Sequence, residues 1–174
     1  MRATRIWITG NAGAGKTTVA ARIAAHLEYP HHELDAVHWL PDWGIPQRDE
    51  FRAEVQSLAE TEHWVIDGNY SKARDLLLAR ADTVIYLNPP RLVALWRVLK
   101  RSLSRALKQE ELWAGNRETL RHFFSRDSLL LYTLRSHRKR ARQFEQESQY
   151  PSHAHIVFVE LRSSRQIRDW IGGL

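Results

Sequence analysis

Short apolar runs alternate along this chain with longer segments in which apolar residues recur every three or four positions. The runs are rich in β-branched residues and lie between polar or turn-forming residues, which is typical of buried strands. They span residues 4–9, 31–35, 63–67, 82–87 and 155–161. The segments with helical spacing span residues 16–28, 48–60 and 71–80, with a last helix up to Gly172 and Gly173. Strands that alternate with helices predict an α/β domain around a parallel sheet.

Residues 91–149 interrupt this alternation with a long, mostly helical stretch. Its leucines, among them Leu92, Leu95 and Leu103, have the spacing of a helix core rather than of stacking platforms for bases. The 174 residues suit one domain, and neither an internal repeat nor a low-complexity linker divides them. We therefore expect a single domain over residues 1–174, with the helical stretch as an elaboration near one end of the sheet.

The composition is that of a globular protein without thiol chemistry. Hydrophobic residues make up 43% and charged residues 26%, and cysteine is absent, which excludes disulfides and thiolate metal sites. The N-terminus turns polar too soon for a signal peptide, and no apolar run is long enough to span a bilayer. We expect a soluble cytoplasmic protein without a membrane partner.

The net charge of +6 is unevenly distributed. Between Arg91 and Arg142, fourteen basic residues stand against four acidic ones, so this segment carries +10 and the remainder −4. A basic segment in an otherwise acidic domain is typical of proteins that bind a polyanion, either nucleic acid or the phosphates of a nucleotide. A solvated helical surface explains some of these arginines equally well.

The segment "GNAGAGKTT" at residues 10–18 matches the phosphate-binding loop pattern G-x-x-x-x-G-K-[ST] between a predicted strand and a predicted helix. Its glycines let successive backbone N–H groups face an anion, and the helix N-terminus adds partial positive charge. Lys16 would reach the β- and γ-phosphates, and Thr17 would offer its hydroxyl to Mg²⁺. The predicted nucleotide-binding residues are Gly10, Asn11, Ala12, Gly13, Ala14, Gly15, Lys16, Thr17 and Thr18. We therefore expect ATP and Mg²⁺ as cofactors.

The run of residues 63–67 adds an acid to this loop. Asp67 ends the apolar run 63–67, the usual position of a carboxylate that holds the Mg²⁺ shell through water, although a turn or capping aspartate is the alternative. The N-K-x-D signature of GTPases is absent, and no apolar strand ends in the Asp-Glu pair of motor ATPases. These absences favour a kinase over both classes.

The order of the loop, "ELD", "VIDGNYSKAR", "VIYLNPPR" and an arginine-rich helical insert resembles adenylate kinase-like P-loop kinases. The segments "ELDAVHW", "DGNYS", "ELWAGNRE" and "FSRDSLL" make it most similar to the bacterial group called DNA topology modulation proteins or adenylate kinase-related proteins. The resemblance covers nearly the whole chain. It implies a three-layer sandwich, a five-stranded parallel sheet in the order 2-3-1-4-5, and a helical lid within residues 91–149.

A kinase lid supplies cations that neutralise the transferring phosphoryl group. We expect Arg101, Arg117 and Arg126 in this catalytic role, together with Lys16 and Asp67. Arg117 and Arg126 are flanked by loop-like residues, as expected in a closing lid. For any single arginine, a solvated surface or a structural salt bridge is the alternative.

The segment "HHELDAVHWLPDW" at residues 31–43 is the predicted acceptor wall. Asp35 ends the predicted second strand, and the ligand crevice of open α/β sheets lies beyond strand ends. There it would grip the acceptor hydroxyl and take its proton, unless its role is structural. Its histidines are interpreted as packing or polar contacts rather than zinc ligands. The predicted substrate-binding residues are Asp35, Trp39, Asn69, Tyr70 and Arg74.

Trp39 and Trp43 are candidates to stack on a flat acceptor, although core packing explains a tryptophan as often. The adenine base is expected near residues 162–164, after the fifth strand. The leading hypothesis is an ATP- and Mg²⁺-dependent phosphotransferase of the nucleotide or small-molecule kinase type. The alternative is a nucleotide-binding regulator that contacts nucleic acid through the basic insert.

Overall fold

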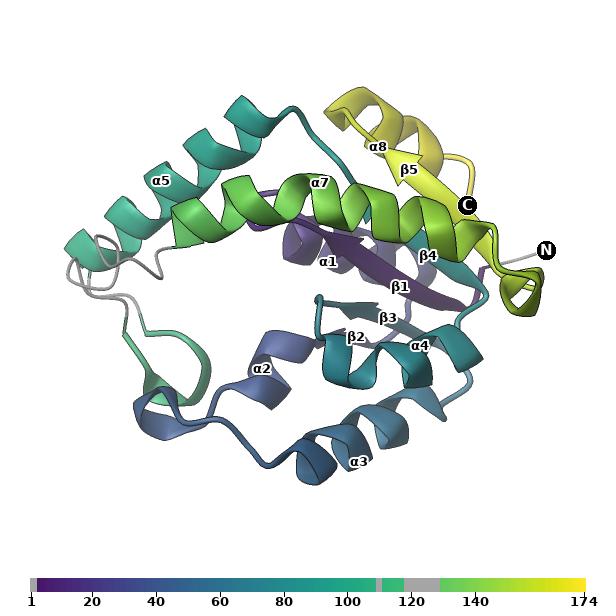
Figure 1. Ribbon diagram of the computed structural model, residues 1–174, viewed down its shortest axis with the longest axis horizontal. Coiled ribbons are helices and arrows are strands. Elements are labelled where there is room, and N and C mark those ends of the chain that lie inside the picture. Colours follow the sequence, from purple (N-terminus) through teal and green to yellow (C-terminus); the bar gives the residue numbers. More distant parts are fainter. Residues whose placement is uncertain (1–2, 109–110, 118–128) are drawn as a thin grey trace.

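The computed structural model describes residues 3–108, 111–117 and 129–174. Its core is a parallel sheet in the order β2-β3-β1-β4-β5, as predicted (Figure 1). The strands are β1 (Arg5–Gly10), β2 (His31–Glu33), β3 (Trp64–Asp67), β4 (Thr83–Leu87) and β5 (Val157–Leu161). Each strand overlaps a run predicted from the sequence, and the boundaries differ by two residues at most.

Helices cover both faces of this sheet and complete three layers (Figure 1). The longer ones are α1 (Lys16–Leu27), α3 (Arg48–Ala59), α4 (Arg74–Arg80), α5 (Arg91–Lys108), α7 (Leu129–Ser148) and α8 (Ser164–Ile171). The shorter ones are α2 (Leu34–His38), η1 (Pro41–Trp43), η2 (Ser71–Ala73), η3 (Trp113–Gly115) and η4 (Pro151–His153). The predicted fold class, a three-layer α/β sandwich, is confirmed.

Two hydrophobic clusters hold the layers together. Ile6 and Ile8 of β1 point into the cluster under α1 and α8, whereas Trp7 between them points into the cluster under α3 and α4. All three side chains are fully buried. Burial on both faces explains why the central strands are continuous apolar runs instead of alternating patterns.

The second strand is shorter than predicted. Its pairing with β3 stops at the Glu33–Asp67 register, because β3 itself ends there. The chain then turns into α2, and the buried Leu34 packs so closely on Gly68 that a Cβ at Gly68 would lie 2.6 Å from the Leu34 Cβ. The expectation that Asp35 ends a strand is therefore wrong, since Asp35 lies in the first turn of α2.

The buried residues of α5 are not the leucines that the sequence pattern indicated. Leu92 of α5 is 80% exposed and Leu103 is 47% exposed, so the helix-core interpretation of these two residues is wrong. The face of α5 that packs on the domain instead carries Ala94 and Val98, which are fully buried beside Gly13. Small side chains let this helix approach the phosphate-binding loop closely.

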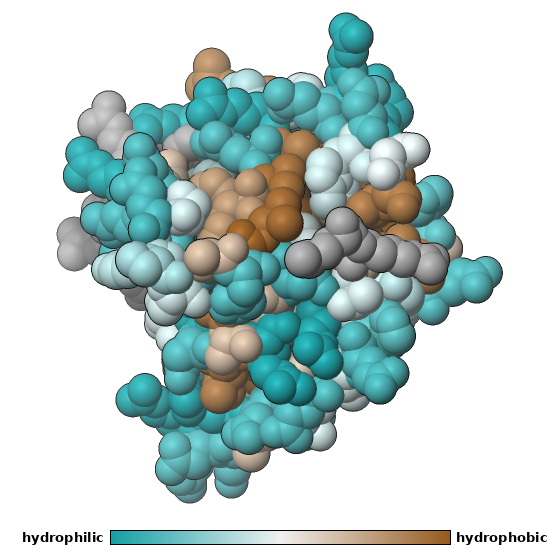
Figure 2. Space-filling model, turned by 90° about the vertical axis from the view of Figure 1, so that its right-hand side faces the viewer, coloured by the Kyte–Doolittle hydropathy of each residue, from teal (hydrophilic) through white to brown (hydrophobic). Residues whose placement is uncertain are grey.

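Figure 2 shows the face at the amino ends of the strands, where hydrophilic side chains surround smaller apolar patches. Val157 at the start of β5 is 55% exposed because β5 is an edge strand. Within the described residues, no helix is long and apolar enough to cross a membrane.

Candidate active site

The phosphate-binding loop joins β1 to α1 in the geometry that its sequence predicts. Gly13 has φ of 73°, and a Cβ there would lie 2.2 Å from the Ala94 carbonyl oxygen, so only glycine is accommodated. Gly15 caps α1 with φ of 91° and has no side chain to bond the first amides of the helix. These amides are therefore available to an anion at the helix N-terminus.

Lys16 begins α1 and reaches back over the loop. Its Nζ donates to the Asn11 carbonyl oxygen at 3.3 Å. Burial lowers the pKa of Lys16, an effect opposed by the nearby Asp35 and Asp67 carboxylates. Arg101 and Arg140 also lower the pKa of Lys16, so both guanidinium groups act on the ammonium from the insert. Phosphate oxygens at this position would supply the missing negative charge.

Thr17 and Asp67 lie side by side, as the predicted metal site requires. The Thr17 hydroxyl donates to Asp67 Oδ1 at 3.3 Å. The other carboxylate oxygen, Oδ2, lies 2.8 Å from His31 Nε2, and Asp67 is only 3% exposed. A hydroxyl beside a carboxylate suits Mg²⁺, which takes oxygen ligands and keeps several waters.

The turn after β3 connects the loop with α2. Asn69 donates from Nδ2 to the Gly10 carbonyl oxygen, which ties this turn to the phosphate-binding loop. The Tyr70 hydroxyl donates to Asp35 Oδ1. Asp35 therefore has a fixed orientation, although it comes from a helix instead of from a strand end.

Lys16, Thr17, Asp35, Asn69 and Tyr70 line one cleft of about 840 Å³, whereas Asp67 and His31 lie behind its lining residues. The phosphate-binding loop forms its floor, and segments from the insert and from residues 33–43 form its walls. A cleft of this size is within the range of small-molecule sites. The lining residues outside the loop are Glu33, Asp35, His38, Trp39, Trp43, Gly68, Asn69, Tyr70, Arg101, Arg105, Glu111, Leu112, Trp113 and Arg140.

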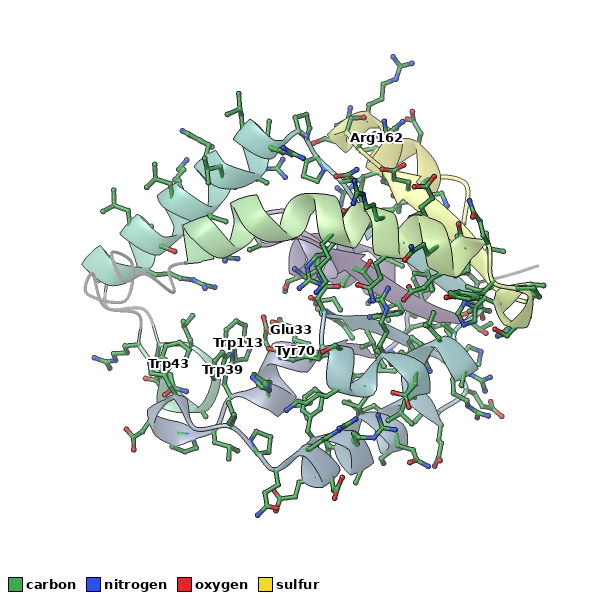
Figure 3. All side chains as sticks on the ribbon, viewed as in Figure 1. Glu33, Trp39, Trp43, Tyr70, Trp113 and Arg162 are labelled. Atoms are coloured by element: carbon green, nitrogen blue, oxygen red, sulfur yellow. The ribbon has the colours of Figure 1, made fainter. Side chains whose placement is uncertain are left out.

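One wall of the cleft is aromatic (Figure 3). Trp39 and Trp43 meet edge to face, with ring centroids 5.2 Å apart at 87°. Trp113 approaches from the insert, and its Nε1 donates to Glu33 Oε2 at 3.3 Å. Figure 3 shows these side chains together with Tyr70 on the same side of the molecule. Trp39 and Trp43 both line the cleft, and their contact with an acceptor stays a prediction.

Asn116 joins the two segments that carry these tryptophans. Its Oδ1 accepts from the Trp43 backbone N–H at 2.8 Å, and its Nδ2 donates to the carbonyl oxygens of Leu40 and Trp113. Asn116 is 5% exposed. Asn116 therefore ties the insert to residues 40–43. In the sequence these residues belong to the string "ELWAGNRE", and its Gly-Asn pair indicates a turn but no partner for that turn.

Arginines of the insert line the cleft, but only one of them was predicted. Arg101 and Arg105 come from α5 and Arg140 comes from α7. Arg117 instead lies at an exposed position 3.8 Å from Glu111 and does not line the cleft, so its predicted lid role is not supported by its placement. Arg126 lies outside the described residues.

Comparison with solved structures identifies the architecture. The chain is similar to shikimate kinase from Bacteroides thetaiotaomicron, with 19% identity, a TM-score of 0.57, and coverage of 99% of this chain and 96% of that one. It is also similar to shikimate kinase from Acinetobacter baumannii in complex with shikimate, with 14% identity, a TM-score of 0.61, and coverage of 98% and 90%. A gluconokinase from Sinorhizobium meliloti 1021 matches with 22% identity, a TM-score of 0.57, and coverage of 99% and 93%.

The chain has the P-loop kinase fold. No model of a known protein family matches the chain, and a search of curated proteins finds no match. The likeness to solved structures does not support the narrower resemblance to the DNA topology modulation group.

Within this P-loop kinase fold, Arg74 is placed away from the predicted site. It forms a two-bond ion pair with Glu147 of α7, and its guanidinium carbon lies 4.7 Å from the Trp7 ring centroid. Arg74 does not line the cleft, so the expectation that it contacts the acceptor disagrees with its position. Its side chain anchors the insert to the core.

Two further observations concern possible metal ligands and Arg162. In the part of the chain that the structure describes, no three His, Asp or Glu side chains gather as a metal cluster. Arg162 pairs with Glu160 and lies apart from the aromatic wall, beside α8 (Figure 3). An adenine pocket near residues 162–164 stays a prediction.

Proposed function

We propose that this protein is an ATP- and Mg²⁺-dependent phosphotransferase whose acceptor is a small molecule with a hydroxyl group. One observation carries the proposal. The phosphate-binding loop and the Asp35–Tyr70 pair line the same cleft. Donor and acceptor can therefore be held against one another, which is the main requirement of phosphoryl transfer.

The donor end of the cleft has the groups that hold a nucleoside triphosphate. The amides of residues 10–18 and the Lys16 ammonium would bind its phosphates. Thr17 and Asp67 would hold Mg²⁺, directly and through water, and the ion when bound neutralises charge on the phosphates. The buried Asp67 is already oriented for this by Thr17 and His31.

The acceptor end has a carboxylate in position to take a proton. In the proposed reaction the acceptor oxygen bonds to the γ-phosphorus while the bond from that phosphorus to the β–γ bridging oxygen breaks. The electron pair leaves with ADP, and the hydroxyl proton passes to Asp35 and then to water. A base is required because an alcohol, unlike a phosphate acceptor, must lose a proton.

The insert supplies cations for the charge that develops during transfer. Arg101 and Arg140 line the cleft and both lower the pKa of Lys16, which supports a role for them near the phosphates. Cations fixed in a water-poor site stabilise a phosphoryl transition state more strongly than they would in water. We also propose that the protein is related to the bacterial adenylate kinase-related proteins and that it is cytoplasmic.

The test is acceptor-dependent release of ADP. We expect release to rise only when a suitable alcohol is present, and Lys16→Ala to lower the stimulated rate by about a hundredfold or more, because a preorganised charge is lost. Lys100→Ala is the matched control, since Lys100 is exposed on α5 and does not line the cleft. The rate is measured with an ADP-coupled assay.

Two results would contradict the kinase proposal. One is ADP release that no alcohol stimulates. The other is tight binding of DNA or RNA that weakens steeply with salt, as phosphate neutralisation by a basic surface requires. The second result would favour the nucleic-acid-binding alternative.

A further inference from the structure

One face of α5 presents large apolar side chains to the solvent. They form what we call the α5 stripe: Leu92 is 80% exposed, Trp96 60%, Leu99 43% and Leu103 47%. More than half of the large apolar side chains that are exposed in the described part of the chain belong to α5. This helix lies at the edge of the molecule, with α7 beside it (Figure 1). A continuous apolar patch of this kind marks an interaction surface.

The α5 stripe is separate from the faces of the helix that the domain itself uses. Ala94 and Val98 are buried against the phosphate-binding loop. Arg101 and Arg105 line the cleft. The stripe therefore adds nothing to the core or to the cleft, and its apolar character needs another reason.

The spacing of the stripe is that of a coiled-coil seam. Its four residues follow one another at intervals of four, three and four positions. Apolar residues at these intervals repeat every 3.5 residues on average, as positions a and d of a heptad do. A seam this narrow is typical of a helix that packs on another helix, since the apolar face of a helix on a domain core is wider.

A second copy of α5 matches this seam. In a twofold antiparallel pair centred between Trp96 and Leu99, Leu92 meets Leu103 of the partner subunit. Trp96 then meets Leu99 of the partner subunit, so every apolar position has an apolar partner. The helix dipoles oppose one another in this order. The Lys100 ammonium lies 5.1 Å from the Trp96 ring centroid, and in the pair it lies beside apolar side chains instead of beside a cation.

The area of the stripe is sufficient for such a pair. Its neighbour Val93 is 39% exposed and extends the apolar surface. At about 200 Å² for a whole residue of this size, the five side chains present on the order of 500 Å² per copy. Two copies would bury about 1,000 Å², which is near the lower limit for a specific interface. We therefore expect a dimer that forms in the micromolar range of concentration.

We propose that two copies of this chain form a twofold dimer through the α5 stripe, with their α5 helices antiparallel. This inference does not depend on the proposed function, because oligomeric state is measured without a substrate. Each copy carries a net charge of +6, which opposes pairing at low salt. Salt screens this repulsion and should strengthen the dimer, whereas it would weaken the binding of an acidic protein or an anionic membrane to α5.

The test is the mass of the protein in solution, measured by sedimentation equilibrium over a range of concentrations at low and moderate salt. Trp96→Glu should weaken dimerisation by about a hundredfold or more, because the twofold axis places an unpaired carboxylate on both sides of the interface. Trp96→Leu should retain the dimer, since leucine suits a seam position. Ile45→Glu is the matched control, because Ile45 is 62% exposed and lies outside α5. Circular dichroism and the unfolding midpoint check that each variant folds.

The absence of cysteine from the chain allows disulfides to map the pairing. A mixture of Leu92→Cys and Leu103→Cys should cross-link rapidly under mild oxidation, because the antiparallel order brings these positions together. Each variant alone should cross-link slowly, since its two copies lie at opposite ends of the seam. Ile45→Cys measures the rate of chance collision.

A protein that stays monomeric at every concentration and salt would overturn the inference. A dimer that Trp96→Glu leaves intact would also overturn it, because the interface would then lie elsewhere. A monomer that binds vesicles of phosphatidylserine and phosphatidylcholine, and loses this binding in Trp96→Glu, would assign the stripe to a membrane surface instead. Faster cross-linking of Leu92→Cys alone than of the mixture would overturn the antiparallel order.

Discussion

At the scale of single residues, the site depends on how Asp67 is held. Each carboxylate oxygen has its own partner, Oδ1 with Thr17 and Oδ2 with His31. The sequence indicated Thr17 and Asp67, but it gave no reason to distinguish His31 from the other histidines of residues 31–43. Only the parallel pairing of β2 with β3 brings His31 beside this acid.

His31 is therefore expected to position the carboxylate that holds Mg²⁺. His31→Ala should lower activity by about tenfold to a hundredfold, with a higher Mg²⁺ requirement, because outer groups orient metal-binding ligands. His31→Gln should recover part of the loss, since its amide can still donate to Asp67. The measurement is acceptor-stimulated ADP release against Mg²⁺ concentration. An unchanged Mg²⁺ requirement in His31→Ala would assign His31 a purely structural role.

At the scale of elements, the insert is attached to the domain at two places. Ala94 and Val98 pack α5 on the phosphate-binding loop, and Glu147 pairs α7 with Arg74. The side chains of Arg74 and Glu147 are only 13% and 10% exposed. Loss of one partner from such a buried pair leaves an uncompensated charge, which is more costly than removal of both.

Glu147→Gln should accordingly lower the free energy of unfolding by about 3 kcal/mol. The double variant Arg74→Met with Glu147→Leu should lose clearly less, because no buried charge remains. Glu145→Gln, an exposed change on the same helix, is the control and should have little effect. Urea denaturation measures all three. Equal losses in the single and double variants would show that the ion pair does not link these helices.

At the scale of the whole molecule, the cleft is assembled from distant parts of the chain. The loop of residues 10–18, the segment 33–43, the turn after β3 and the insert all contribute to its lining. Ligand binding should therefore connect these parts and stabilise the folded protein as a unit.

ADP with Mg²⁺ should raise the unfolding midpoint of the protein. At a nucleotide concentration of about 100 times the dissociation constant, the gain is about 2.7 kcal/mol. Lys16→Ala should lose most of this shift and Lys100→Ala should retain it, because only Lys16 lies at the phosphate end of the cleft. Thermal denaturation with and without nucleotide is the measurement. A shift of equal size in Lys16→Ala would place the nucleotide elsewhere.

The sequence by itself determined the strands, the phosphate-binding loop and the acid that ends β3. These features follow from local patterns, namely apolar runs, a glycine-rich turn before a helix, and an acid at the end of a buried strand. The pattern also indicated Asp35 and Tyr70 as acceptor contacts, although it placed Asp35 on a strand that ends before Asp35 is reached.

Only the tertiary structure decided which residues of the insert reach the cleft. Trp113, Arg105 and Arg140 lie far along the chain from the acceptor segment, and their spacing does not distinguish them from their neighbours. Packing also holds Arg74 away from the cleft, because Glu147 of α7 pairs with it, and Arg117 lies at an exposed position outside the cleft lining. Local sequence specifies conformation and the chemistry of adjacent residues. The acceptor wall depends on contacts between distant segments, which no local pattern encodes.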